Sequence, residues 1–416
     1  MNNRRKLKKG RANQPSRKIT RSILPNEVEE NILSRLPVKS LMRFRCVCKH
    51  WCNLVTKPHF IKMQLHQSTQ IKEVSKLVFP YAGRLYSTNV GSCGKQYIKT
   101  RGQLKNHMQK QLVLPFRDGN CDMFLKIIGS CNGLLCLSAF DSLYLLNPVT
   151  KEYKRLPYPE ILTGRSSSSS TILTIFGFGY SPRTDEYKVM MITYFMIEQP
   201  VHSAVFVYTL GINSYWRLIK GTSHKINYPY HHGLVNGALH WMTSGIPDSS
   251  KVVPISFDFG DEKFRELFLP KSFSQDDTNH PMGLGELSGF LSLYHCKADE
   301  NFDIWVMKVY GDEQSWTKVF SVAQPISSGI QGLFKPLCIL KKDVVLGESD
   351  IGIFILDVVK NECRQLHLRY PPYAFGTEMY LESLVSLGTD GGVDVSNKHG
   401  RKEKEGGRLA EEAKSD

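Results

Sequence analysis

The feature that most limits how this chain can fold is a phrase that recurs through most of its length. Each copy holds a short alternating strand, a turn opened by Asn, Asp or Gly, and a second strand that ends near a Leu. The copies begin at Ser142, Val205, Ile255, Ile304 and Ile353. Their turns fall near Asn147, Gly211, Gly260, Gly311 and Val359. Repeated strand pairs of this kind predict an all-β domain from about residue 75 onward.

The spacing of the copies favours one kind of all-β fold. The last four turns are about fifty residues apart, which is the period of four-stranded propeller blades. A second phrase, a tight turn leading into an alternating strand, precedes three of the copies: "CNGLLCL" at 131–137, "VNGALHW" at 235–241 and "LSGFLSL" at about 286–293. We predict an irregular β-propeller over 75–390, with about five clear blades, and a serine-rich loop at 164–170. A β-sandwich or an open pair of sheets is the alternative.

Residues 22–66 have a helical pattern instead. Pro25 suits the first position of a helix, acidic residues follow it, and Pro37 ends that helix. A second apolar stripe follows, broken into two helices near 45–47, and Pro58 is expected to close the segment. Three short helices of this size cannot hide all their apolar positions from water, so we expect a partner to cover one face.

Both regions resemble known families. Ile23 to Leu65, "ILPNEVEENILSRLPVKSLMRFRCVCKHWCNLVTKPHFIKMQL", resembles an F-box in its LP entry, acidic first turn, RLPVKSL junction and V-C-K-x-W helix. The β region resembles the F-box associated, kelch-like domain of plant F-box proteins, through "IIGSCNGLLCL", "LYLLNPVTKEYKRLP", "FGFGYSPRTDEYKV", "VNGALHWM" and "ISFDFGDEKFRELFLP". Together the two resemblances cover about 20–390, giving an α+β multidomain chain.

The resemblance implies a substrate receptor of a Skp-cullin-F-box ubiquitin ligase. The F-box would dock on a Skp-type adaptor, and through it on cullin and RING subunits, while the β domain would bind an unidentified substrate protein. The family's adaptor-facing positions correspond here to Leu24, Pro25, Ile32, Leu33, Leu36, Pro37, Leu41, Val47, Cys48 and Trp51. The resemblance implies no catalytic residue, cofactor or metal ion.

The charge of the chain is unevenly distributed. There are 54 Lys and Arg against 39 Asp and Glu, for a net charge of +15, and nine of the basic residues lie in 1–21, where no acidic residue occurs. We predict that this arm and the tail, 391–416, are disordered. The arm is compatible with nuclear import, so the expected location is the nucleus, the cytoplasm or both. It has neither the aromatic residues nor the groove-entering helix of a specific nucleic-acid reader, so specific nucleic-acid binding is not expected.

Membrane insertion and secretion are not expected either. No run of about eighteen uncharged apolar residues occurs, and the N-terminus lacks the apolar stretch of a secretory signal. The sequence therefore predicts a soluble intracellular protein. Its ten cysteines should stay thiols.

The most suggestive cluster of ligand-type side chains is Cys46, Cys48, His50 and Cys52. On a helix, Cys48 and Cys52 share one face, while Cys46 and His50 share another, so the four cannot converge on one tetrahedral zinc. A nucleophilic thiol would need a positioned base or cation. We favour packing over a metal or catalytic role.

Other candidate sites also have a structural interpretation. His231, His232 and His240 suit a loop or blade edge, because adjacent residues of a strand point to opposite faces. Gly177 and Gly179 lack the Gly-Lys-Ser/Thr and the helix of a phosphate loop. The tryptophans of the β region are expected to wedge neighbouring sheets together rather than to line a recognition pocket; they are Trp216, Trp241, Trp305 and Trp316.

Two other functions stay open. The propeller could bind a small ligand or glycan, which would require polar side chains converging at one end of its axis. The chain could also act as a scaffold outside a ligase.

Overall fold

The computed structural model describes residues 24–70, 75–91, 109–115, 125–139, 142–157, 171–195, 202–211, 214–226, 231–244, 252–273, 280–296, 301–323, 333–372 and 376–388. The predicted arm at 1–21, the predicted tail at 391–416 and the serine-rich loop at 164–170 lie outside these residues.

The N-terminal part of the described chain is a helical unit. Its helices are α1 (Asn26–Ser34), α2 (Val38–Phe44), α3 (Lys49–Val55) and α4 (Pro58–Gln70). The break between α2 and α3 is confirmed, but the predictions that the unit has three helices and that Pro58 closes the segment are wrong. Proline fits the first position of a helix because its missing N–H has no partner to lose there, and Pro58 begins α4. None of the described helices is long and apolar enough to cross a membrane.

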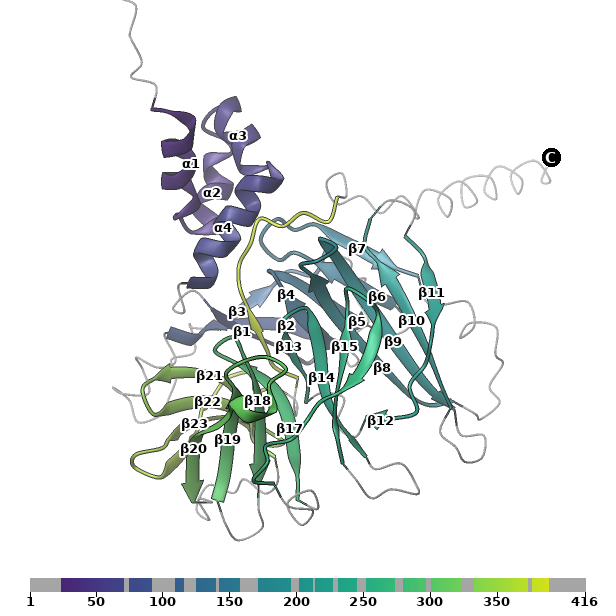
Figure 1. The fold of residues 1–416 in the computed structure, drawn as a ribbon. Helices are drawn as coiled ribbons and strands as arrows, with labels where there is room; N and C mark the ends of the chain where they lie inside the picture. The colour runs from purple at the N-terminus through teal and green to yellow at the C-terminus, as the bar shows by residue number, and fades with distance from the viewer. Residues whose placement is uncertain are drawn as a thin grey trace, which may run out of the picture.

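The described strands form six sheets (Figure 1). The first contains β1 (Lys76–Tyr81), β2 (Arg84–Asn89), β3 (Lys110–Leu112) and β25 (Glu378–Tyr380). The second contains β4 (Lys126–Cys131), β5 (Leu134–Ala139), β6 (Ser142–Leu146) and β7 (Tyr153–Leu156). The third contains β8 (Thr171–Ser181), β9 (Glu186–Phe195), β10 (His202–Thr209) and β11 (Trp216–Ile219).

The remaining three sheets follow in chain order. The fourth contains β12 (Lys225–Ile226), β13 (Gly233–Val235), β14 (Ala238–Ser244), β15 (Pro254–Asp258) and β16 (Lys263–Glu266). The fifth contains β17 (Met282–Leu287), β18 (Phe290–Cys296), β19 (Asn301–Met307) and β20 (Trp316–Ala323), with the short 3₁₀ helix η4 (Glu313–Ser315) before β20. The sixth contains β21 (Lys335–Lys341), β22 (Val344–Ser349), β23 (Gly352–Asp357) and β24 (Glu362–Gln365).

The sheets are antiparallel blades, which confirms the propeller prediction over the sandwich. All five predicted turns join the last two strands of a blade, as Asn147 does between β6 and β7. The second phrase is the hairpin that begins a blade's inner strands. In two of its copies an Asn-Gly pair has positive φ at both residues, 50° and 80° at Asn132 and Gly133, as a two-residue hairpin requires.

The first blade, which contains β1, β2, β3 and β25, is the one that the repeat did not reveal. β25 returns from the far end of the sequence and pairs antiparallel with β1, with Val78 opposite Glu378. The blade therefore takes strands from both ends of the domain, and it joins the ring into a closed circle. This closure completes the ring, and the edges that remain are the inner and outer strands of each blade.

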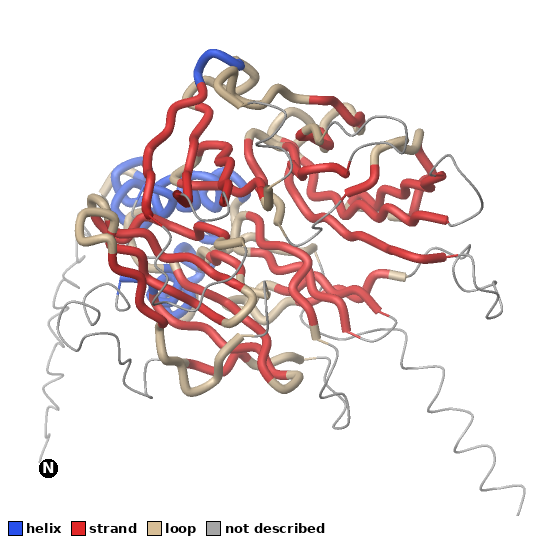
Figure 2. Tube along the Cα trace, turned by 90° about the horizontal axis from the view of Figure 1, so that it is seen from below, coloured by secondary structure: helices blue, strands red, loops and turns tan. Residues whose placement is uncertain are grey.

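After β25 the chain runs on to the helical unit (Figure 1). Leu384 is 5 % exposed and packs in the same core as Leu41 and Phe60. The Asn147 side-chain amide donates to the carbonyls of Ser383 (3.2 Å) and Val385 (2.7 Å). We call residues 381–388 the C-terminal strap, because they fasten the helices to the propeller. Seen from below in Figure 2, the helices lie behind the sheets.

Tryptophans join neighbouring blades, as predicted. The indole N–H of Trp316 in β20 donates to the carbonyl of Phe268 in the preceding blade at 3.0 Å. Trp216 in β11 donates in the same way to Pro157. Trp241 is fully buried.

Replacing Leu384 with alanine tests the strap. Because Leu384 is buried in the helical core, Leu384→Ala should lower the free energy of unfolding by about 2 to 5 kcal/mol. Val359→Ala is the control, since Val359 is 76 % exposed. Equal midpoints for the two variants in thermal denaturation would contradict the assigned role of the strap.

Candidate functional site

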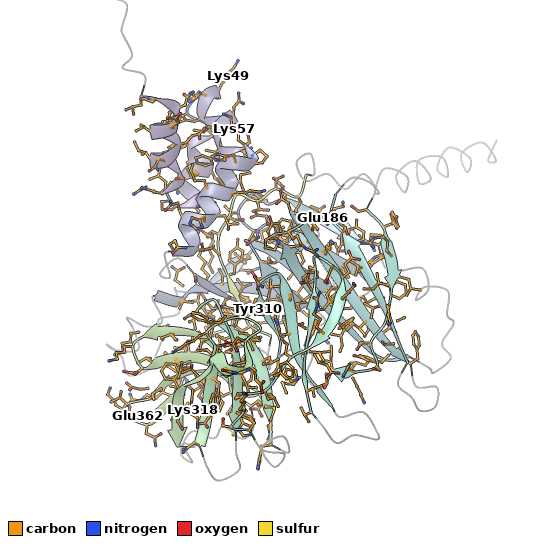
Figure 3. The ribbon with its side chains drawn as sticks, in the orientation of Figure 1. Lys49, Lys57, Glu186, Tyr310, Lys318 and Glu362 are labelled. Carbon is orange, nitrogen blue, oxygen red and sulfur yellow. The ribbon has the colours of Figure 1, made fainter. Side chains whose placement is uncertain are left out.

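The helical unit exposes an apolar face that no described part of the chain covers. Leu24, Val28 and Ile32 are spaced four residues apart, so they lie on one side of α1 and the segment before it. They are 54 %, 43 % and 51 % exposed, and Val47, before α3, is 63 % exposed. We call these four residues the apolar face. Figure 3 labels Lys49, at the start of α3, on the end of the unit that points away from the propeller.

The expected adaptor-facing residues divide by exposure. Leu24, Pro25, Ile32, Pro37, Val47 and Cys48 are exposed, and Leu36 and Trp51 are half-buried. Leu33 and Leu41 are 3 % and 0 % exposed, so the expectation that they belong to one exposed surface is corrected. They face inward because α1 and α2 need a core of their own before any partner binds. The set also omitted Val28, which the four-residue spacing from Leu24 to Ile32 could have indicated.

Trp51 holds the unit together. Its indole N–H donates to Glu29 of α1, and its ring lies 5.2 Å from that of Phe44. His50 lies 2.9 Å from the other Glu29 oxygen. The hydrogen bond from Trp51 lowers the pKa of Glu29. Replacing Trp51 would therefore damage the fold as well as any interface.

The cysteine cluster is arranged differently from the expectation of a continuous helix. Cys46 lies before α3, and Cys48 caps it, its sulfur accepting from the backbone N–H of Trp51 at 3.4 Å. The face-sharing argument is therefore wrong for both pairs, because neither Cys46 nor Cys48 lies within a helix. Among the residues that the structure describes, no group of three His, Cys, Asp or Glu side chains is placed to hold a metal ion.

A second candidate site is a cavity where the inner strands of the propeller meet. It has a volume of about 120 Å³ and is lined from six blades, by β4, β8, β13, β17, β21 and β25. Its charged side chains are Glu286, Lys335 and Glu378, with His232 beside them. Lys335 Nζ lies 3.4 Å from Glu378 Oε1, and His232 Nε2 lies 3.9 Å from the same oxygen. No regular spacing along the sequence relates these groups, because each comes from a different blade.

A buried carboxylate beside this cavity has a structural role. Burial raises the pKa of Glu348 to about 7. Its oxygens accept from the backbone N–H groups of Gly376 and Thr377, at 3.1 and 3.2 Å, and from the Thr377 hydroxyl at 2.7 Å. Glu348 therefore fixes the residues that lead into β25.

His231 and His232 lie in the loop before β13, as expected, but the expectation is wrong for His240, which lies within β14. His240 is fully buried in β14 between the Gly233 carbonyl (3.0 Å) and the Tyr310 hydroxyl (2.9 Å). Burial lowers its pKa to about 4. Burial, with Lys335 and His232 nearby, lowers the pKa of His231 to about 3, and its Nδ1 lies 2.8 Å from the Tyr294 hydroxyl. Both imidazoles are neutral and structural.

Comparison with known proteins agrees with this architecture. Residues 22–63 match the F-box domain, and residues 96–373 match the F-box associated beta propeller domain. The F-box protein CPR1 of Arabidopsis thaliana is 30 % identical to the chain, over 94 % of each. An F-box/kelch-repeat protein of the same plant is 29 % identical, over 87 % of this chain and 95 % of its own.

Solved structures are more distant. An oligogalacturonate lyase of Vibrio parahaemolyticus matches with a TM-score of 0.37 and 9 % identity, over 70 % of this chain and 78 % of that one. This likeness is too slight to bear on function.

The helical unit and the propeller, with the two domain matches, define an F-box protein of the plant type. The chain belongs to the F-box associated β-propeller family.

The buried histidines predict a loss of stability in acid. Folding holds both pKa values below the ordinary 6.5, so their contribution is complete above pH 6.5 and is lost as pH falls toward 4 and 3. Each should contribute a slope of up to about 1.4 kcal/mol per pH unit in that window. Urea unfolding between pH 7 and 4 should show a shallower slope for His240→Gln than for the parent. His59→Gln, at a largely exposed position, should leave the slope unchanged; a parent-like slope in His240→Gln would contradict the assignment.

Proposed function

We propose that this chain is the substrate-recognition subunit of a Skp-cullin-F-box ubiquitin ligase. The observation that carries the proposal is the apolar face of an F-box that has a core of its own, which includes Leu33, Leu41 and Phe60. Leu24, Val28, Ile32 and Val47 are exposed apolar residues, and apolar surfaces of this kind mark protein interfaces. A Skp-type adaptor is the partner that an F-box implies, and it would bring the cullin and RING subunits.

Rigid attachment of the F-box supports this role. Leu384 of the strap packs in the helical core, and Lys62 of α4 pairs with Asp185 of the β8–β9 turn at 2.6 Å. A receptor that holds its two ends at a fixed separation raises the effective concentration of substrate near the transfer machinery. The chemistry would then belong to a conjugating enzyme, and this chain would be non-catalytic.

The substrate would bind at the end of the propeller away from the F-box. Antiparallel strands place the first and third turns of each blade at one end, and Val149 and Asp185, in two such turns, contact the helical unit. The second strands of the blades therefore end, and the third strands begin, at the opposite end of the propeller, which faces away from the helices (Figure 1). A protein bound there would not compete with the adaptor.

A small ligand at the axis is a weaker alternative. The cavity contains the converging polar groups that such a function requires, including Lys335 and Glu378. Its volume of about 120 Å³ is, however, well below the roughly 300 to 1,000 Å³ of ordinary ligand sites. The geometry therefore favours capture of a protein on the propeller surface.

The nuclear or cytoplasmic location stays a proposal that rests on the basic residues of the 1–21 arm.

Charge placed on the apolar face tests the proposal. The variant Leu24→Glu/Ile32→Glu/Val47→Glu should bind a purified Skp-type adaptor at least about 100-fold more weakly, because desolvated apolar contacts at an interface centre contribute about 2 kcal/mol or more each. Its unfolding midpoint should stay near that of the parent, since all three residues are exposed.

The matched control carries Leu218→Glu and Val359→Glu, at apolar positions of the propeller that are 64 % and 76 % exposed. It should bind the adaptor as the parent does. In affinity capture with proteasome activity blocked, adaptor and cullin should accompany the parent and the control but not the triple variant. Their absence from all three would overturn the proposed function.

A further inference from the structure

A pocket lies at the junction of the F-box and the propeller. Its volume is about 470 Å³, within the range of small-molecule sites. Its walls come from α2, from β1, β2 and β3 of the first blade, from the β6–β7 turn, and from the end of β25 with the strap. Residues far apart in the sequence therefore form one concave surface. The adaptor-facing apolar face and the axial cavity have no residue in it.

The pocket is strongly basic. Five cationic side chains line it, Lys39, Arg43, Lys76, Lys110 and Lys151. The single carboxylate among its lining residues is Glu382 of the strap.

Glu382 balances only part of this charge. It accepts from Lys39 at 2.9 Å and from Lys76. Arg43, Lys110 and Lys151 are exposed and make no salt bridge within the described segments. Burial lowers the pKa of Lys76 despite Glu382 beside it. Cations that face one cavity repel one another, and an anion bound between them would relieve that repulsion.

The pocket also offers a hydrogen-bond donor without an acceptor. Tyr380 is 2 % exposed and lines the pocket, and its hydroxyl has no hydrogen-bond partner in the part of the chain that the structure describes. A buried polar group left in this way costs about 1 to 3 kcal/mol, so such groups usually have a partner. An anionic oxygen would supply one if the lining side chains shift to admit it, because the hydroxyl is closed to solvent in the free chain.

The chemistry of the lining identifies the class of ligand. Lys and Arg in excess exclude a metal ion and suit phosphate, which Arg and Lys bind through charge-assisted hydrogen bonds. Met42, Leu112 and Val149 give the pocket an apolar wall, which suits the carbon frame of an organic molecule. A nucleic acid would need an open groove with stacking aromatics, and the sole aromatic residue of the lining, Tyr380, is buried.

We propose that this junction pocket binds a small organic molecule carrying several phosphate groups, and that its occupation strengthens the attachment of the F-box to the propeller. The ligand would contact α2, both adjoining blades and the strap at once. A ligand that binds only the assembled junction stabilises the folded chain in proportion to its occupancy. The inference does not depend on ligase activity, since it concerns the free chain.

Calorimetric titration of the purified full chain with tripolyphosphate and with inositol hexakisphosphate, at physiological salt, tests the proposal. At least the second probe should bind saturably with one site and raise the unfolding midpoint. Arg43→Glu/Lys110→Glu/Lys151→Glu should weaken binding at least tenfold. The control Lys220→Glu/Lys263→Glu/Lys308→Glu makes the same change of net charge at exposed lysines of other blades, and its affinity should stay within twofold of the parent.

Tyr380→Phe separates binding from folding. It removes a hydroxyl that has no partner among the described residues, so the unfolding midpoint without ligand should be unchanged or higher, while the affinity for the probe falls several-fold. Equal weakening in the two triple variants would show attraction to net charge alone and would overturn the proposal. Failure of both probes to bind would also overturn it. So would binding only to vesicles that contain a phosphoinositide, or only to a single-stranded oligonucleotide.

Discussion

The pairing of β25 with β1 is the contact on which the rest of this structure depends. It joins the last strand of the domain to the first, so the six described sheets form a closed ring of blades. Glu348 fixes the residues before β25 through three accepted hydrogen bonds. The strap can reach the helices only because β25 brings the chain back to the first blade. One continuous segment, β25 followed by the strap, therefore closes the propeller and attaches the F-box to it.

This arrangement separates the surfaces available for binding. The apolar face lies along α1 and just before α3, while the third strands of the blades begin at the end of the propeller that faces away from the helices (Figure 1). The basic pocket lies between these two surfaces, where the strap crosses from one domain to the other. A ligand in this pocket would act on the junction between the F-box and the propeller rather than on either of these two surfaces. The contacts at the junction therefore set the distance between the apolar face and the far end of the propeller.

Much of the fold was predictable because it repeats. The hairpin turns at Asn147, Gly211, Gly260, Gly311 and Val359 are local features, set by residues that allow tight turns between alternating strands. The first blade was not predictable from a repeat, because β3 has only three residues and β25 is separated from β1 by nearly the whole domain. For the site, family resemblance located the F-box surface, but burial of Leu33 and Leu41 depends on how the helices pack.

The sequence by itself determined the class of protein. Hairpin period, helix spacing and the F-box motif are short-range patterns, and local backbone preferences are enough to specify them. Only the tertiary structure decided which apolar residues stay exposed, where the strap lies, and which lysines face one pocket. Lys39, Lys76, Lys110 and Lys151 come from separate segments, and no spacing along the chain relates them. Their juxtaposition exists only once β25 has closed the ring, because long-range contacts are fixed by packing rather than by neighbours in sequence.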